Sequence, residues 1–149
     1  MDQKALLCEK AVKRFLEGYN CAQSVLSTMC EFWNIKSELV PKIATPFGGG
    51  IGLRGSVCGA LTGGVMAIGI KHGANEPSAK KHLKAYELAG VVYTEFQKRH
   101  GTVLCRELIG YNLSDPKDLE KAGKAGVFEK KCVGFVKTMV EMLAEINEH

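Results

Sequence analysis

The sequence predicts an all-α protein that folds as one compact bundle. Along most of the chain the apolar residues recur at intervals of three and four rather than two, which is the period of helices and not of strands. The chain has 149 residues, of which 46% are hydrophobic, and this suits one buried core while leaving little room for a second. Glycines follow several of the apolar runs, as they do at helix ends. We therefore expect a single domain over residues 1–149 with about five main helices and one or two short ones.

Three of these helices are expected in the first third of the chain. The first covers about residues 2–17 and stops at Gly18, and the second covers about residues 20–33, with an asparagine as its cap. A short third helix is expected over residues 37–44, because a serine precedes a carboxylate there as in a capping pattern. It should end ahead of Pro46, since the residue before a proline disfavours the helical conformation.

The remaining helices follow a glycine-rich loop. A fourth helix is expected from a cap at Ser56 to residue 72, a long one over residues 78–100, and a short one over residues 102–109 with Thr102 as its cap. The polar, lysine-rich stretch of residues 112–126 is interpreted as a loop before the last helix, which runs to about residue 146. In the long helix one apolar face is expected to be inward: Leu83, Tyr86, Gly90, Tyr93 and Phe96.

The charge pattern argues against several classes of partner. The chain has 20 basic and 16 acidic residues, and its lysines are dispersed rather than gathered in a basic arm, so a nucleic-acid partner is not indicated. The N-terminal segment lacks the unbroken apolar stretch of a secretory signal, and the most apolar segment, residues 57–70, is shorter than the ~20 residues of a membrane span. We expect no membrane insertion and a cytoplasmic location. The glycine-rich face of that segment and the modest net charge permit a homodimer.

The cysteines are the strongest chemical signal in the sequence. There are six, with no CxxC pair, so neither a zinc ribbon nor a thioredoxin-type motif is present. Three of them fall in the first turn of an expected helix: Cys21, Cys58 and Cys105. Free N–H groups and the helix dipole favour a negative sulfur there, and we expect lowered pKa values at these thiols. Cys8 and Cys30 lie on apolar stripes in mid-helix and are interpreted as core residues.

The glycines around Cys58 allow two further interpretations. Gly50, Gly52 and Gly55 fit the spacing GxGxxG, but no strand precedes them, so a dinucleotide fingerprint is rejected. Arg54 and the N–H groups at the helix start could hold an anion or the Cys58 thiolate itself. Gly55, Gly59 and Gly63 recur every four residues, which would let another backbone come close to the turn that bears Cys58.

These residues carry a resemblance to a known family. The stretch Cys58-Gly59-Ala60-Leu61-Thr62-Gly63 resembles the CGAxxG core of the C_GCAxxG_C_C family, a prokaryotic family named for redox activity and marked by four cysteines. Asn20-Cys21-Ala22-Gln23 resembles its first cysteine block, and Cys105-Arg106-Glu107-Leu108 with Gly110-Tyr111 resembles its third. Cys132 falls where the last is expected, so the likeness covers about residues 18–135. It implies that the functional cysteines are Cys21, Cys58, Cys105 and Cys132.

The leading hypothesis is a small oxidoreductase or electron carrier whose four thiols converge and cycle between dithiol and disulfide. A thiolate attacks the oxidant, and a second cysteine resolves the mixed intermediate. We predict Cys58 as the attacking sulfur and Cys21 as its resolving partner; the redox partner, substrate and any cofactor are not identified by the sequence. The alternative is a metal or iron–sulfur module with the same four cysteines as ligands. None of the four histidines is assigned as a ligand.

Overall fold

The computed structural model describes residues 2–146, and this part of the chain is all-helical, as predicted, apart from one isolated β-bridge. None of its helices is both long and apolar enough to cross a membrane. In chain order the elements are α1 (Gln3–Glu17), α2 (Cys21–Phe32), the 3₁₀ helix η1 (Lys42–Phe47), α3 (Gly59–His72), α4 (Ala79–His100), α5 (Cys105–Ile109), α6 (Pro116–Lys124), the π-helix η2 (Phe128–Cys132) and α7 (Val133–Ile146).

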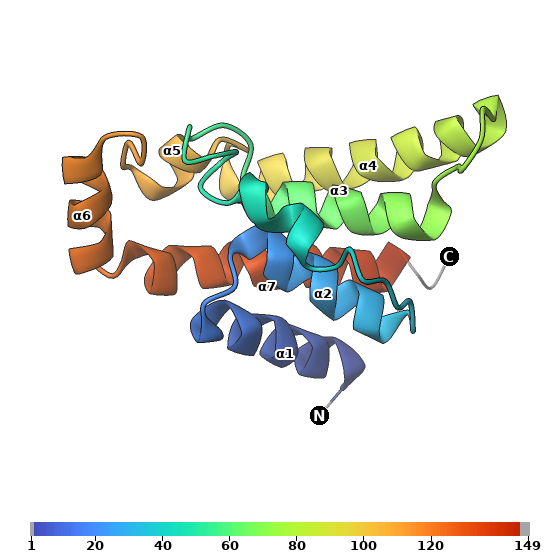
Figure 1. Ribbon diagram of the computed structural model, residues 1–149, viewed down its shortest axis with the longest axis horizontal. Helices are drawn as coiled ribbons and strands as arrows, with labels where there is room; N and C mark the ends of the chain where they lie inside the picture. Colours follow the sequence, from blue (N-terminus) through green and yellow to red (C-terminus); the bar gives the residue numbers. More distant parts are fainter. Residues whose placement is uncertain (1, 147–149) are drawn as a thin grey trace.

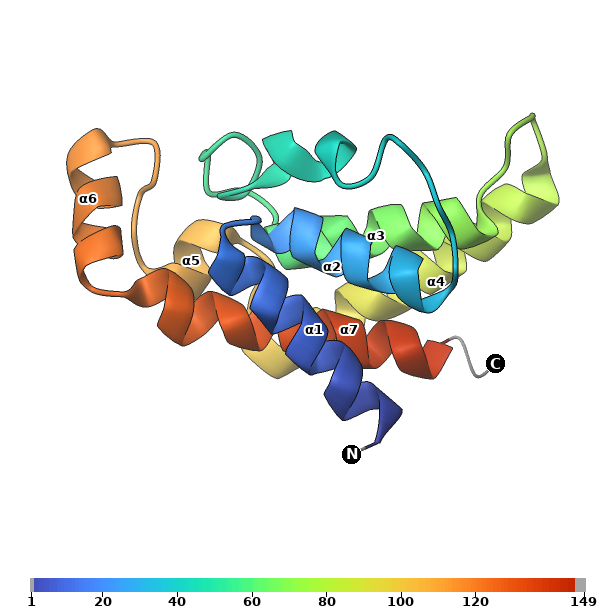
Figure 2. The same cartoon turned by 60° about the horizontal axis from the view of Figure 1, so that its bottom comes forward.

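The centre of the bundle is formed by α2, α3 and α7, which pack on one another (Figure 1). Helix α1 covers α7 and α2 on one side, and α4 covers α3 and α7 on the other (Figure 2). Helices α5 and α6 lie together at one end of the molecule, where α5 also contacts η2 (Figure 1). The glycine loop between η1 and α3 reaches this same end, and so the chain segments that bear the candidate cysteines meet there.

The caps of the first two helices follow the sequence signals. The Asp2 carboxylate accepts a hydrogen bond from the N–H of Ala5 at 2.8 Å, and Gly18 closes α1 in the left-handed conformation. Helix α2 starts with a reciprocal capping box: Asn20 Oδ1 accepts from the N–H of Gln23, and Gln23 Oε1 accepts from the N–H of Asn20. The box fixes the position at which α2 begins, which is Cys21.

Helices α2 and α3 approach each other at backbone distance because α3 carries glycine on the facing side. A Cβ added to Gly63 would lie 2.5 Å from the carbonyl oxygen of Ala22. A Cβ on Gly59 would lie 3.3 Å from the Cβ of Cys21 and from the backbone N of Ala22. The expectation that a neighbouring backbone comes close to the turn that bears Cys58 is therefore confirmed for Gly59 and Gly63, and that backbone is the start of α2. It is wrong for Gly55, which lies in the loop before α3, where an added Cβ would be 2.8 Å from the side chain of Arg106.

Two segments differ from the sequence predictions. The α-helix expected over residues 37–44 is instead a turn followed by η1, in which Pro46 is internal, and Ser37 Oγ accepts only from the N–H of Leu39 in a local turn. The stretch of residues 112–126, expected to be a loop, contains α6. Its Asp115 cap accepts from the N–H of Lys117, and a proline occupies its first turn, which is the usual start of a helix.

The apolar face expected to be inward on α4 is mostly exposed. Leu83 and Tyr86 are 58% and 69% exposed, Tyr93 and Gly90 are exposed as well, and of that predicted face only Phe96 is buried. In its first half α4 lies beside α3 (Figure 1), where Leu88 packs against the core, whereas Leu83 and Tyr86 remain exposed. The helix is anchored through its second half, where Val92 and Phe96 are fully buried.

Candidate functional site

All four cysteines that the sequence singled out line one cavity of about 400 Å³. They come from four separate places in the chain: Cys21 is the first residue of α2, Cys58 the N-cap of α3, Cys105 the first residue of α5, and Cys132 the last residue of η2. All are free thiols in the structure. The fold thus gathers sulfurs that are up to 111 residues apart in the sequence, from 21 to 132.

Cys58 and Cys105 are held near each other by an antiparallel backbone pairing. Val57 and Leu104 form the isolated β-bridge. The N–H of Cys58 donates to the carbonyl of Val103 at 2.8 Å, and the N–H of Cys105 donates to the carbonyl of Ser56 at 2.7 Å. These bonds tie the end of the glycine loop to the start of α5, so both cysteines are positioned by main-chain contacts.

The helix starts at these two cysteines differ in detail from the prediction. Ser56 does not cap α3, because its backbone takes part in the pairing with α5, and Cys58 itself occupies the N-cap position. Thr102 does not cap α5; its hydroxyl accepts from the N–H of Leu104, which is the N-cap. Cys58 and Cys105 nevertheless both lie at the start of a helix, where the backbone N–H groups have no hydrogen-bond partner within the helix.

Cys21 and Cys132 form the most strongly coupled pair of thiols. A hydrogen bond from the Cys21 thiol to the Cys132 sulfur lowers the pKa of Cys132 and, together with burial, raises the pKa of Cys21. Lys131 further lowers the pKa of Cys132, whereas burial and Glu129 oppose this. Because the two thiols interact, they lose their protons in two steps, the first at lower pH than the second.

Cys132 ends a short π-helix, which is a rare conformation that recurs at functional sites. In η2 the chain is wound more widely than in an α-helix, and α7 continues directly from it at Val133. The segment that carries Cys132 therefore differs in its winding from the regular helix that the sequence predicts over residues 128–146.

The thiols of Cys58 and Cys105 do not have the lowered pKa that their helix-start positions predict. The N–H groups of Ala60 and Leu61 do lower the pKa of Cys58, but burial outweighs them and raises it from an ordinary 9.0 to about 12. Burial, with a contribution from Cys132, raises the pKa of Cys105 to about 11. Arg54 is exposed and donates a hydrogen bond to the carbonyl of Gly52. The expected thiolate at Cys58 is therefore wrong near neutral pH.

The walls of the cavity are predominantly apolar. Glu129 is the one charged residue among the described residues that line it, and its side chain belongs to an exposed residue of η2. Leu16 and Tyr19, at the end of α1 and just after it, also line the cavity and are exposed, which places them at its mouth. Larger apolar side chains of the lining come from six parts of the chain, and they include Phe15, Leu53, Leu108, Leu113, Phe128 and Phe135.

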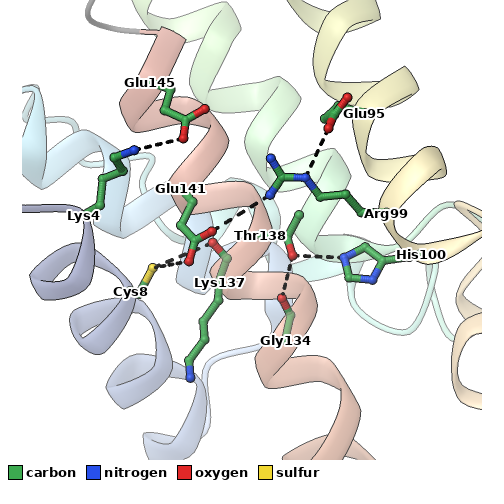
Figure 3. A network of polar contacts seen from close by, with 10 residues as sticks. All are labelled: Lys4, Cys8, Glu95, Arg99, His100, Gly134, Lys137, Thr138, Glu141 and Glu145. Carbon is green, nitrogen blue, oxygen red and sulfur yellow. Dashed lines mark hydrogen bonds and ion pairs between the residues drawn. The ribbon is translucent and has the colours of Figure 1, made fainter.

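The other two cysteines lie outside this cavity. Cys8 and Cys30 are buried in the hydrophobic core, as the sequence predicts. Cys8 on α1 faces α7, where its thiol donates to the Glu141 carboxylate at 3.6 Å (Figure 3). Burial and this carboxylate raise the pKa of Cys8 to about 11, so its environment is unsuited to a reactive thiolate.

Residues 2–146 contain no group of three or more histidine, cysteine, aspartate or glutamate side chains placed so that it could hold a metal ion. The histidine closest in sequence to the cavity segments is His100, whose Nε2 lies 3.0 Å from the hydroxyl of Thr138 (Figure 3). Its ring also lies against the rings of Phe96 and Phe135. The four cavity cysteines are included in this finding, and their sulfurs would have to move closer together to act as ligands.

Comparison with known proteins agrees with the cysteine pattern. A sequence model of the family described as "Putative redox-active protein (C_GCAxxG_C_C)" matches residues 19–146. The chain belongs to this family. The C_GCAxxG_C_C match includes all four cavity cysteines and leaves Cys8 outside. An uncharacterized protein of Archaeoglobus fulgidus is 29% identical to this C_GCAxxG_C_C chain over 113 residues, which are 67% of the chain and 74% of the relative. No solved structure matches the present chain.

Sequence reasoning missed the carboxylate and the apolar walls of this site. Glu129 could have been found from its position, since it precedes Cys132 by three residues and so lies close to it along one side of a helix. The wall residues carry no such signal. Phe15 and Leu113 are ordinary apolar residues in the sequence, and only the packing of distant segments turns them into a cavity lining.

Proposed function

We propose that this protein is a thiol–disulfide redox protein in which Cys21 and Cys132 are the exchanging pair. The observation that carries the proposal is that all four family cysteines line one cavity, in which Cys21 and Cys132 shift each other's pKa. Thiol–disulfide chemistry needs a thiolate and a second sulfur within reach of it. Cys132 supplies the thiolate, since its pKa is lowered, and Cys21 supplies the neighbouring thiol.

With a disulfide as oxidant, the exchange has two steps. The Cys132 thiolate attacks one sulfur of the disulfide, a Cys132 mixed disulfide forms, and the other sulfur leaves as a thiolate. The Cys21 sulfur then attacks Cys132, its proton passes to the leaving thiolate, and the Cys21–Cys132 disulfide forms. Two protein thiols have been oxidised and one external disulfide has been reduced to two thiols. The attacking role predicted for Cys58 thus passes to Cys132, while Cys21 keeps the resolving role.

Cys58 and Cys105 are suited to a second, slower pair. Their raised pKa values keep both protonated near neutral pH, so neither is a ready nucleophile. Each nevertheless interacts electrostatically with Cys132, and the backbone pairing of Val57 with Leu104 holds their chain segments together. They could reduce the Cys21–Cys132 disulfide by internal exchange, in which a Cys58–Cys105 disulfide forms and Cys21 and Cys132 return to thiols.

The second candidate function is a metal or iron–sulfur module, which the convergence of four cysteines on one cavity also favours. Metal binding requires deprotonated thiols. Three of the four have raised pKa values, so forming the site would release protons from groups that hold them tightly. This candidate therefore predicts metal that purifies with the protein and a visible spectrum for an iron–sulfur cluster.

One experiment separates the two functions. The protein is purified anaerobically, its metal content is measured, and its thiols are counted before and after equilibration in dithiothreitol redox buffers, with peptide mapping of any disulfide. We expect metal-free protein that loses two thiols reversibly through a Cys21–Cys132 bond. Cys21→Ser and Cys132→Ser should abolish this bond, and Cys8→Ser and Cys30→Ser, at the core cysteines, should leave it intact. Stoichiometric metal, or oxidation that does not depend on Cys21 and Cys132, would contradict the proposal.

A further inference from the structure

The cavity that the four thiols line has the size of a small-molecule binding site. Its volume of about 400 Å³ lies within the range of ligand pockets, roughly 300–1,000 Å³. The exposed residues Leu16 and Leu53 are part of its lining, so the cavity has an exit to the surface. If the Cys21–Cys132 pair is redox-active, as proposed above, its reaction partner must enter this space or contact its mouth.

The walls select for an uncharged, apolar partner. Three phenylalanines line the cavity, Phe15 from α1, Phe128 from η2 and Phe135 from α7, and the leucines of the glycine loop and α5 complete it. Rings packed against aromatic side chains gain specific contacts in addition to the burial of apolar surface. A flat ring compound is therefore better matched to these walls than a flexible polar chain.

The charge at the mouth excludes anionic partners. Glu129 is the one charged group among the described lining residues, and no lysine or arginine of this part of the chain lines the cavity. A substrate that carries a carboxylate or phosphate would meet a like charge and find no counter-charge within the cavity. Peptide disulfides with free carboxylates and nucleotide-based oxidants are both anionic, and both are disfavoured.

We infer that the oxidant of the Cys21–Cys132 pair is a small, uncharged ring compound of the quinone class. The Cys132 sulfur adds to a ring carbon, and Cys21 then attacks that sulfur. The carbon–sulfur bond breaks, its electron pair stays on the ring, and the Cys21–Cys132 disulfide forms. The quinone gains two electrons, and two protons end on its two oxygens to give the hydroquinone. Of these two protons, that of Cys21 comes from its thiol, and the other is taken up from water in place of the proton that Cys132 released when it became a thiolate.

The test compares two probes that share the 1,4-naphthoquinone ring and carry either a propionamide or a propionate side chain at carbon 2. Reduced protein is mixed anaerobically with each probe, and hydroquinone formation, protein mass and the Cys21–Cys132 disulfide are followed. We expect the amide probe to react at least about tenfold faster than the carboxylate probe, because the two differ only in the charge that faces Glu129.

Variants at Glu129 test this selectivity without disturbing the core, because the residue is exposed. Glu129→Gln should reduce the ratio of the two rates, and Glu129→Lys should reduce it further or invert it. The ratio is the decisive quantity, because a change in the pKa of Cys132 alters both rates equally. If neither variant changed the ratio, selection by charge at this mouth would be overturned.

The remaining outcomes separate this inference from the proposed function. Oxidation by diamide, an uncharged thiol oxidant, reports whether the Cys21–Cys132 disulfide forms at all. If diamide forms it and the amide probe yields no hydroquinone, the quinone class is wrong and the redox pair stands. If the amide probe is reduced no faster than the carboxylate probe, selection by charge is wrong. If diamide does not form it, the proposed function itself fails. A protein that gains the mass of the ring and releases no hydroquinone would overturn the reduction step.

Discussion

Gly63 of α3 lies so close to Ala22 of α2 that a Cβ on the glycine would be 2.5 Å from the alanine carbonyl oxygen. Such a contact cannot be relieved by moving a side chain, because the opposing atom belongs to the backbone of a helix. The two helices that begin at Cys21 and just after Cys58 are thus set at a separation that only glycine allows. This separation is what brings the two cysteines to the same cavity.

Gly63→Ala is therefore expected to destabilise the protein by roughly 1–3 kcal/mol, as overpacking does, even though alanine is the better helix former. The matched control is Gly69→Ala in the same helix, where an added Cβ has no heavy atom within 4 Å. That variant should stabilise by up to ~1 kcal/mol. Denaturant unfolding of both variants checks the pair, and equal effects would mean that the close approach of α2 and α3 does not matter energetically.

The elements that could be predicted from the sequence are those whose signals are local. Asn20 and Gln23 cap α2 through their own side chains, and Gly18 ends α1 through its own backbone conformation, so nothing distant is needed to place these boundaries. Cys21, Cys58 and Cys105 were found in the same way, from their positions at helix starts, whereas Cys132 was found only through the family resemblance. Helix α6 had a local signal as well, in Asp115 and the proline after it, but its lysines suggested a loop.

What could not be predicted depends on segments far apart in the chain. Helical spacing places Leu83 and Tyr86 on one face of α4, but it does not say whether another element covers that face, and none of the described residues does. The position of Cys58 at a helix start predicts a low pKa, whereas its burial by the loop, α5 and α2 produces a high one. The position of Cys58 at a helix start determines which N–H groups lie near its sulfur, and tertiary packing determines whether those groups or burial dominate its pKa.

The raised pKa of Cys58 makes the stability of the protein depend on pH in the alkaline range. The pKa of this thiol is about 12 in the folded protein and 9.0 in the unfolded chain. Its contribution to the free energy of unfolding is therefore fully present below pH 9 and is lost as the pH rises from 9 towards 12. Unfolding then releases one proton more, which lowers the free energy of unfolding by at most about 1.4 kcal/mol per pH unit.

Cys58→Ala should remove this part of the slope and retain the part that comes from the other thiols with raised pKa values. Chemical denaturation of wild type and variant at a series of pH values between about 8 and 11 checks the prediction. The comparison uses the slopes and not the absolute stabilities, because the truncation also leaves a small cavity. Parallel curves for the two proteins would show that the Cys58 thiol is not protected from ionisation in the folded state.

The hydrogen bond from Cys21 should make Cys132 the most readily alkylated of the four cavity thiols near neutral pH, because Cys21, Cys58 and Cys105 all have raised pKa values. Cys21→Ala removes the donor and should slow iodoacetamide labelling of Cys132 about tenfold, in line with a hydrogen bond to a charged group. Cys21→Ser keeps a donor and is the matched control. Peptide mapping by mass spectrometry gives the rates; if serine and alanine at position 21 slowed labelling equally, the hydrogen bond would not be its cause.

Gly50 fixes the contact between the glycine loop and Cys105. An added Cβ would lie 2.8 Å from the Cβ of Cys105 and 2.6 Å from the backbone N of Ser56, the residue whose carbonyl accepts from the N–H of Cys105. Gly52 in the same loop also has a positive φ, of 54° against 69° for Gly50, but an added Cβ there meets no atom within 4 Å. The two glycines therefore share the backbone strain and differ in the steric contact.

Gly52→Ala should cost about 1–2 kcal/mol, the strain of a left-handed conformation. Gly50→Ala should cost roughly 1–3 kcal/mol more, because it must also push the loop away from α5. Since that displacement separates Ser56 from Cys105, Gly50→Ala should in addition speed the alkylation of Cys105 in the native state, whereas Gly52→Ala should not. Thermal unfolding and native labelling together check this; equal labelling of Cys105 in the two variants would mean that the loop does not shield this thiol, and that its burial comes from the helices alone.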